Sequence, residues 1–215
     1  MHAVLSRVVL ASGNAGKLRE LQALLAPTGA RLVAQAALGV GDAEEPHPTF
    51  VENALAKARH ASRATGLPAI ADDSGVCVPA LGGAPGVRSA RYAAELGGER
   101  SDAANNARLL AELAGLVDRS AYFYCVLVLL RQADDPQPIV ADGLWYGEIV
   151  DTPRGTGGFG YDPHFLVPEL GRTVAELDAA TKNRVSHRGR AMRDLLARLE
   201  QARLLPAGGG TGARP

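Results

Sequence analysis

The sequence predicts an α/β fold with antiparallel pairing in the middle of the chain. The apolar residues 8–11 predict a buried strand, and the leucines that follow a glycine turn recur at the spacing of a helix. Residues 121–130, "AYFYCVLVLL", are aromatic or aliphatic throughout and are typical of a strand. With 215 residues, 47% of them hydrophobic, the chain can bury the core of one domain or one bilobed domain, which we expect to span residues 1–205.

Helices and strands alternate along the rest of the chain. We expect strands at 31–34 and 139–150, with a turn or bulge at Asp142-Gly143, and helices at 17–25, 51–63, 101–115 and 189–204. Residues 68–78, "PAIADDSGVCV", predict a strand, an acidic turn and a second strand. Ser101 is a typical N-cap, and Thr173 and Glu176 have the spacing of a capping box, which predicts a helix start. Residues 206–215 are rich in glycine and predict a disordered tail.

The charge balance argues against broad electrostatic attraction to nucleic acid or to anionic membranes. The chain has 23 basic and 23 acidic residues, so any anion must be bound by a local cluster. No apolar run approaches the roughly 20 residues that cross a bilayer, and the N-terminus predicts a first core strand rather than a signal peptide. Cys77 and Cys125 stand in apolar, strand-like contexts, so we expect reduced core thiols and a cytoplasmic protein.

The segment "ASGNAGKLREL", residues 11–21, predicts a strand, a glycine turn and a helix start, a geometry that directs backbone N–H groups at an anion. It is not a Walker P-loop, because alanine and leucine stand where that motif needs glycine and Ser or Thr. Gly13, Asn14 and Gly16 tolerate left-handed backbone. The helix dipole disfavours Lys17 unless an anion is present, which indicates a phosphate-binding lysine; the alternative is a solvated lysine beside an ordinary turn.

Two acidic pairs are candidates for metal binding. Magnesium takes one or two carboxylates together with substrate phosphates, and a neighbouring carboxylate can act as a base. For Glu44-Glu45 a solvated loop is the favoured alternative. Asp72-Asp73 follows an apolar strand and places charge near the core, which is costly without a partner. At a strand end the two side chains would point to opposite sides, so that one faces a given cleft and the other anchors loop backbone.

A glycine-rich block, "RGTGGFGYDPHF", covers residues 154–165. A backbone with so many glycines can approach a ligand closely, and a ring beside it can stack on a flat ligand. Phe159 offers only a π face, whereas Tyr161 adds a hydroxyl group. The alternative interpretation is a packed glycine loop with core aromatic residues.

The densest basic cluster is "TKNRVSHRGRA", residues 181–191, just before the last expected helix. Its lysine, arginine and histidine side chains could bind phosphates or the carbonyl oxygens of a base. A solvated helix start is the alternative. In the helix at 51–63, Glu52, Asn53 and Lys57 lie a turn or less apart, and we interpret them as polar partners on one helix face.

Six segments then occur in a recognisable order: "LASGNAGKLREL", "TFVENALAKA", "AIADDSGVCVPALGGAPGVRSARYA", "YCVLVLL", "PRGTGGFGYDPHF" and "AELDAATKNRVSHRGRA". Together they resemble the noncanonical purine nucleoside triphosphate pyrophosphatases, a HAM1-like family also called inosine triphosphatases or XTP/dITP diphosphatases. The resemblance covers about residues 8–198, and the glycine-rich block and "SHRG" are its most specific parts. It implies a mixed, elongated central sheet flanked by helices, with two lobes around a substrate cleft.

The resemblance also implies an activity. The family hydrolyses inosine, deoxyinosine and xanthosine triphosphates (ITP, dITP and XTP) to the monophosphate and pyrophosphate, needs Mg²⁺, and forms a homodimer. Carried onto this chain, Asp73 is catalytic, and the metal ligands are Glu44, Glu45 and Asp73. The implied substrate contacts are Ser12, Gly13, Asn14, Ala15, Gly16, Lys17, Ser74, Phe159, Gly160, Tyr161, Asp162, Lys182, His187 and Arg188.

Three other functions stay open at this point. A nucleotide sensor without catalysis would keep the same pocket, although the intact Glu45 and Asp73 argue against it. A nucleic-acid-binding protein would use the basic cluster at 182–190, against which the zero net charge counts. A pyrophosphatase for modified pyrimidine triphosphates would differ only in its choice of substrate.

Overall fold

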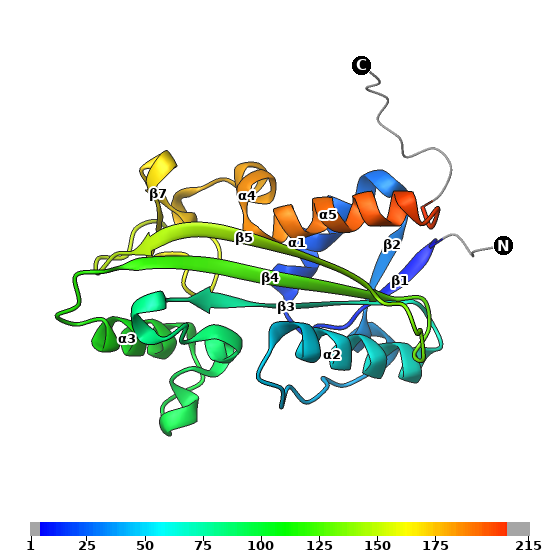
Figure 1. Cartoon of the computed structure of the whole chain (residues 1–215), viewed down its shortest axis with the longest axis horizontal. Helices are drawn as coiled ribbons and strands as arrows, with labels where there is room; N and C mark the ends of the chain where they lie inside the picture. The colour runs from blue at the N-terminus through cyan, green and yellow to red at the C-terminus, as the bar shows by residue number, and fades with distance from the viewer. Residues whose placement is uncertain (1–4, 206–215) are drawn as a thin grey trace, which may run out of the picture. The chain divides into compact units, whose positions relative to one another are not determined.

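The computed structural model describes residues 5–205, so the predicted disordered tail at 206–215 lies outside the described residues (Figure 1). The strands are β1 (Arg7–Leu10), β2 (Arg31–Ala34), β3 (Ala69–Cys77), β4 (Ser120–Leu130), β5 (Ile139–Ile149), β6 (Phe165–Val167) and β7 (Arg172–Thr173). The α-helices are α1 (Ala15–Leu25), α2 (Phe50–Thr65), α3 (Asp102–Glu112), α4 (Ala179–Val185) and α5 (His187–Gln201). The α/β class is confirmed.

One mixed sheet has the strand order β2-β1-β3-β4-β5-β6-β7. Strand β1 runs parallel to β2 and to β3, whereas β6 runs antiparallel to β5 and to β7. In the register between β1 and β3, Leu10 pairs with Ile70, and the next amide, Ala11 N, donates to the Ile70 carbonyl oxygen at 2.9 Å. Because parallel strands end at the same edge of a sheet, this register brings the turn after β1 beside the acids that follow Ile70.

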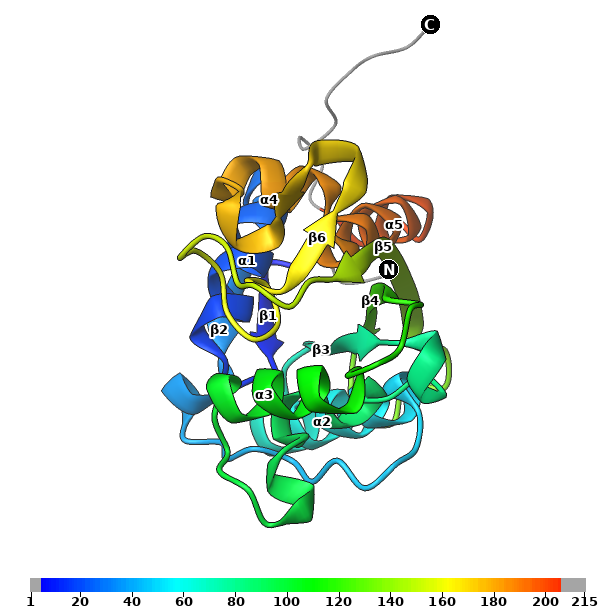
Figure 2. The same ribbon diagram turned by 90° about the vertical axis from the view of Figure 1, so that its left-hand side faces the viewer.

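The chain forms two compact units. The first contains the chain up to Asp73, residues 126–142 and the chain from Ala191 onward, and the second contains residues 74–125 and 143–190. In the first unit, α2 lies on one face of the strands, and α1 lies on the other face together with the part of α5 from Ala191 (Figures 1 and 2). The core of this unit includes Val9, Leu10 and Leu21, which are fully buried.

The second unit has an aromatic core. Phe123 and Phe165 have ring centroids 4.4 Å apart, and Trp145 lies 5.9 Å from Phe165. The imidazole of His187, at the start of α5, stacks on Phe123 at 4.7 Å and 12°. Tyr161 belongs to the same buried cluster, so the core of this unit is built partly from residues of the predicted ligand loop.

Helix α2 shows how the local sequence sets an element. Thr49 caps it by accepting a hydrogen bond from Glu52 N, and Gly66 ends it in the left-handed conformation at φ 68°. Alanines at 54, 58 and 61 form a fully buried stripe, so the small face of the helix can lie close against β1. The prediction of this helix is confirmed, with bounds of 50–65 instead of 51–63.

Three local expectations were wrong. Strand β3 continues through Asp72-Asp73-Ser74 where an acidic turn was expected, because both buried acids have lysine partners within the fold. Strand β5 runs unbroken through Asp142-Gly143, since its inward and outward alternation continues there. The capping box at Thr173 is present, but it closes a single 3-10 turn, Val174–Glu176, and α4 begins only at Ala179.

Candidate active site

The turn after β1 is closed by its own asparagine. Asn14 caps α1, and its Oδ1 accepts from Gly16 N at 2.8 Å and from Lys17 N at 3.0 Å, while Ser12 Oγ accepts from Asn14 N at 3.2 Å. Asn14 has a φ of −81°, and neither Gly13 nor Gly16 has a positive φ, so the turn does not use the left-handed backbone that these residues tolerate. Two turn amides that we expected to point at an anion therefore donate to Asn14 instead.

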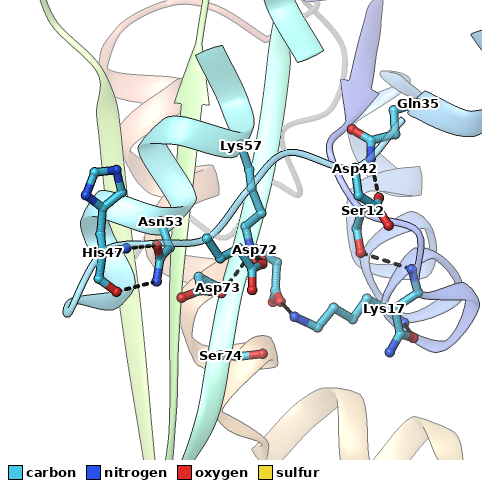
Figure 3. Close-up of polar contacts among 12 residues, drawn as sticks. Ser12, Lys17, Gln35, Asp42, His47, Asn53, Lys57, Asp72, Asp73 and Ser74 are labelled. Carbon is cyan, nitrogen blue, oxygen red and sulfur yellow. Dashed lines mark hydrogen bonds and ion pairs between the residues drawn. The ribbon is translucent and has the colours of Figure 1, made fainter. Parts of the chain in front are cut away.

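Gly13 is required for space rather than for a positive φ. A Cβ atom at this position would lie 3.1 Å from Asp42 Oδ2, tighter than ordinary van der Waals contact. The buried side chain of Gln35 fixes that carboxylate by donating to Asp42 Oδ1 at 2.6 Å (Figure 3). The turn thus packs closely on a second acidic loop.

Lys17 forms an ion pair with Asp72, whose side chain is fully buried. The lysine stands near the N-terminus of α1, where the helix dipole disfavours a cation. Asp72 supplies the anion that this position needs, so the placement of Lys17 does not by itself require a bound phosphate. Asp73, the next residue along β3, pairs with a different lysine, as expected for side chains that alternate along a strand (Figure 3).

Lys57 contacts two carboxylates in the first unit, and these contacts were not predicted. Its Nζ donates to Glu45 Oε1 at 2.7 Å, to Asp73 Oδ1 at 2.7 Å and to the Asp72 carbonyl oxygen at 2.9 Å (Figure 3). The interpretation of Lys57 as a helix-face partner was wrong, because it reaches across to β3. Glu52, its expected neighbour, accepts from Thr49 Oγ1 instead.

Asn53, one turn before Lys57, was interpreted as a polar partner on the same helix face and is fully buried. Its Nδ2 donates to the His47 carbonyl oxygen and its Oδ1 accepts from His47 N, both at 3.0 Å (Figure 3). These bonds hold the loop that carries Glu45. The sequence did contain a signal: Asn53 and Lys57 lie on the same helical stripe as the buried alanines, where a polar residue needs a reason.

Charge is unbalanced around Lys57, because one ammonium group serves two carboxylates. Burial tends to lower the pKa of Lys57, but attraction to Asp73 and Glu45 outweighs it and the pKa is raised. Burial raises the pKa of Asp73 by more than its attraction to Lys57 lowers it. The trio therefore carries one excess negative charge when all three groups are ionised.

Asp73 Oδ2 is buried and has no hydrogen-bond partner within the described part of the chain. A carboxylate oxygen in that state, beside a second carboxylate and with excess negative charge, fits a divalent cation that also takes phosphate oxygens. Glu44 is exposed, and residues 5–205 contain no group of three or more His, Cys, Asp or Glu side chains suited to a metal. The structure thus brings together Glu45 and Asp73, but not the full predicted set with Glu44.

In the second unit, two cations lie near the ring of Phe159. Lys182 Nζ is 4.7 Å and the Arg188 guanidinium carbon is 5.9 Å from the centroid of the Phe159 ring. Arg188 is itself buried and donates to Ser74 Oγ at 3.0 Å. Lys182 and Arg188, two of the expected substrate contacts, thus lie near one aromatic ring.

Asp162 organises the glycine-rich loop. Its Oδ2 accepts from Lys182 Nζ at 2.7 Å and from Phe159 N at 3.0 Å. A Cβ atom at Gly158, where φ is 76°, would lie 2.0 Å from the same oxygen, so glycine is required there on both counts. Asp162 thus shapes the loop from inside.

Tyr161 and His187 are placed differently from the expectation of direct substrate contact. The Tyr161 ring is buried in the aromatic core and its hydroxyl donates to the Ser89 carbonyl oxygen at 2.9 Å. The His187 ring is also buried, stacked on Phe123. Both side chains support the loop and the helix start, and their backbone groups remain candidates for ligand contact.

Comparison with known proteins decides the family. A model of the Ham1 family matches residues 8–198. The chain belongs to the Ham1 family. A dITP/XTP pyrophosphatase of Ralstonia nicotianae is 67% identical over 193 residues, which cover 90% of this chain and 96% of the relative. One from Burkholderia pseudomallei is 66% identical over 198 residues, covering 92% and 95%.

Solved structures of Ham1 proteins have the same fold. The HAM1 protein from Coxiella burnetii matches with a TM-score of 0.83 and 49% identity, over 91% of this chain and 98% of the other. The Ham1 protein of Staphylococcus aureus matches with a TM-score of 0.79 and 40% identity, over 91% and 99%. The predicted resemblance and fold are confirmed. Across residues 5–205, no helix has the length and apolar character needed to span a membrane.

Proposed function

We propose that the chain hydrolyses ITP, dITP and XTP to the nucleoside monophosphate and pyrophosphate and so removes noncanonical purines from the nucleotide pool. Membership of the Ham1 family and the names of the two bacterial relatives support this function. The structural observation that carries it is Asp73, a buried carboxylate with one oxygen on Lys57 and the other without a partner among residues 5–205. A sensor that only binds nucleotide has no need of this costly arrangement.

We propose Mg²⁺ as the metal, held by Glu45 and Asp73; when bound, it would polarise the phosphate oxygens and offset developing charge. Asp73 orients the attacking water and accepts its proton, a role that its raised pKa favours. The water oxygen bonds to the α-phosphorus, the bond to the α–β bridging oxygen breaks, and pyrophosphate leaves with that electron pair. Lys17 assists at the phosphates, and Lys57 keeps the two carboxylates in place.

Base selection would take place around Phe159. Its ring can stack on any purine and so supplies affinity without discrimination. A 6-keto purine presents an acceptor where adenine presents an amine, and donors of Arg188 or of the backbone at His187 would pair with that oxygen. Facing adenine, each such donor would lose its partner at a cost of roughly 1–3 kcal/mol.

We also propose that the enzyme is a cytoplasmic homodimer and that residues 1–205 act as one bilobed domain. Leu96 and Val117, both in the second unit, are 76% and 97% exposed. These two exposed side chains are not in themselves an interface, and the proposal of a homodimer rests on the resemblance to the family. Light scattering coupled to size exclusion tests this directly, because the dimer requires twice the mass of the chain.

The function is tested by pyrophosphate release from ITP, dITP, XTP, GTP and ATP, with Mg²⁺ and with EDTA. We expect fast turnover of the first three substrates and loss of turnover in EDTA. Equal turnover of ATP would refute the proposed base selection. Nucleotide binding without turnover of any substrate would favour the sensor, turnover only of modified pyrimidine triphosphates would favour the related pyrophosphatase, and salt-dependent DNA binding would revive the nucleic-acid alternative.

A further inference from the structure

The first turn of α3 holds the backbone of the glycine-rich loop at one residue. Asp102 Oδ2 accepts from Gly160 N at 2.7 Å, and Asn106 Nδ2 donates to the Gly160 carbonyl oxygen at 2.9 Å. Both polar groups of Gly160 are therefore fixed by side chains 58 and 54 residues away along the chain. The helix that provides them is itself fixed, because Ser101 Oγ caps it at Ala104 N.

Gly160 lies directly after Phe159, so this contact determines where the ring of Phe159 stands. On the other side, Phe159 N donates to Asp162 Oδ2, and Tyr161 is anchored in the core through its hydroxyl. Gly160 has a left-handed φ of 63° and no side chain through which packing could hold that conformation. The hydrogen bonds from Asp102 and Asn106 therefore hold the backbone of Gly160 in this conformation.

We propose that Asp102 and Asn106 are positioning residues for nucleotide binding: they fix the Gly160 backbone so that Phe159 presents its ring beside Lys182 and Arg188. This inference rests on the proposed function. Neither residue of α3 was among the expected site residues, and neither has to touch the substrate.

The chemistry of Asn106 supports a role beyond packing. The side chain is buried, and its Nδ2 also donates to the Asp102 carbonyl oxygen at 2.8 Å. Its Oδ1, however, is buried without a hydrogen-bond partner in the described residues. A buried amide oxygen without a hydrogen bond costs free energy, so packing alone does not explain an asparagine here. The Nδ2 bond to the Gly160 carbonyl oxygen does explain it.

The test is steady-state hydrolysis of ITP by Asp102→Ala and by Asn106→Leu. Loss of a bond to Gly160 should let the loop move, so we expect KM for ITP to rise by about tenfold while kcat changes by less than about threefold. Inhibition by inorganic tripolyphosphate, which has no base to stack, should keep its wild-type inhibition constant. A variant that is merely misfolded would lose both.

Two controls make the test decisive. Asp102→Asn keeps an oxygen acceptor for Gly160 N and should restore a KM close to that of the wild type. Glu99→Ala removes an exposed acid from the preceding loop and should change neither constant. If wild-type protein hydrolyses ITP and both α3 variants keep its KM, the positioning role is refuted. If wild-type protein does not hydrolyse ITP, it is the proposed function that fails.

Discussion

Asp73 and Asp162 are two buried aspartates that each pair with a buried lysine, and they differ in how their other contacts use the carboxylate. Each accepts a hydrogen bond at 2.7 Å from a buried lysine, Lys57 for Asp73 and Lys182 for Asp162. Asp162 uses the oxygen on its lysine to hold Phe159 N as well, and the loop packs tightly on it. Asp73 leaves Oδ2 buried and without a partner in residues 5–205.

The difference teaches that a buried lysine–aspartate pair does not by itself mark a catalytic group. Such a pair can serve the fold, as it does where Asp162 shapes its loop, because a buried carboxylate with several donors is fully used. The unused oxygen of Asp73 is the feature that sets it apart. In the proposed function this oxygen holds a metal or a water molecule, and that use would account for its cost to the fold.

The largest effect should come from Asp73→Asn. The amide keeps the shape of the side chain but removes the base and one metal ligand, so we expect turnover of ITP to fall by about a thousandfold or more. Asp162→Asn is the matched variant, and it should retain kcat within about tenfold because its carboxylate acts on the loop only. Equal losses of kcat in the two variants would erase the distinction between the two aspartates. Pyrophosphate release at saturating ITP measures both.

The second effect concerns stability and should be largest at Asp162. Lys182→Met leaves a buried carboxylate without its cation, and we expect the free energy of unfolding to fall by about 3–5 kcal/mol. Adding Asp162→Asn to that variant neutralises the buried side chain and should recover a substantial part of the loss. Urea unfolding followed by the fluorescence of Trp145, which is buried in the same unit, provides the measurement.

Arg63→Met is the control for this experiment. Arg63 and Asp134 form an ion pair at 3.4 Å in which both side chains are largely exposed, so its loss should cost less than about 1 kcal/mol. If the exposed pair and the buried pair cost the same, burial is not the reason for the strength of the Lys182–Asp162 contact.

Local signals were predictable from the sequence. The first strand, the Ser101 cap, the Thr173 capping box and the glycine-rich loop all depend on neighbours within a few residues, and the structure contains each of them. The N-cap at Asn14 was predictable in the same way, because asparagine is among the preferred N-cap residues at a helix start. We expected the amides of this turn to bind a ligand, although the side chain of Asn14 could accept their hydrogen bonds.

Long-range pairing was not predictable in this way. Lys57 meets Glu45 and Asp73 across 12 and 16 residues, and only the packing of α2 decides that they meet. The continuity of β3 through its acids has the same origin, because the isolated motif carries a charge cost that distant lysines remove. The contact of Glu45 with Lys57 likewise depends on the fold, in which Asn53 bonds to His47 in the loop that carries Glu45.

The third effect concerns the ring of Phe159, whose backbone N–H donates to Asp162. Phe159→Leu keeps an apolar side chain but removes the stacking face, so we expect KM for ITP to rise by about tenfold with little change in kcat. KM for GTP should rise by the same factor, because stacking does not distinguish purines. A change in the preference for ITP over GTP would show that the ring takes part in discrimination.

The smallest expected effect is a change in stability on neutralising Asp73, and its sign is the informative part. The pKa of Asp73 is raised in the folded state, so the folded protein favours the protonated form, and the ionised form costs free energy as the pH rises through that pKa. Asp73→Asn should therefore raise the free energy of unfolding at pH 7, by up to about 1 kcal/mol.

That advantage should shrink as the pH falls toward the ordinary range of a carboxyl group, since the wild-type side chain then becomes neutral too. Urea unfolding of both proteins between pH 4 and pH 8 measures the difference. A variant that is less stable than the wild type at pH 7 would mean that the bond to Lys57 outweighs the burial of the charge, and that Asp73 stabilises the fold in the same way as Asp162.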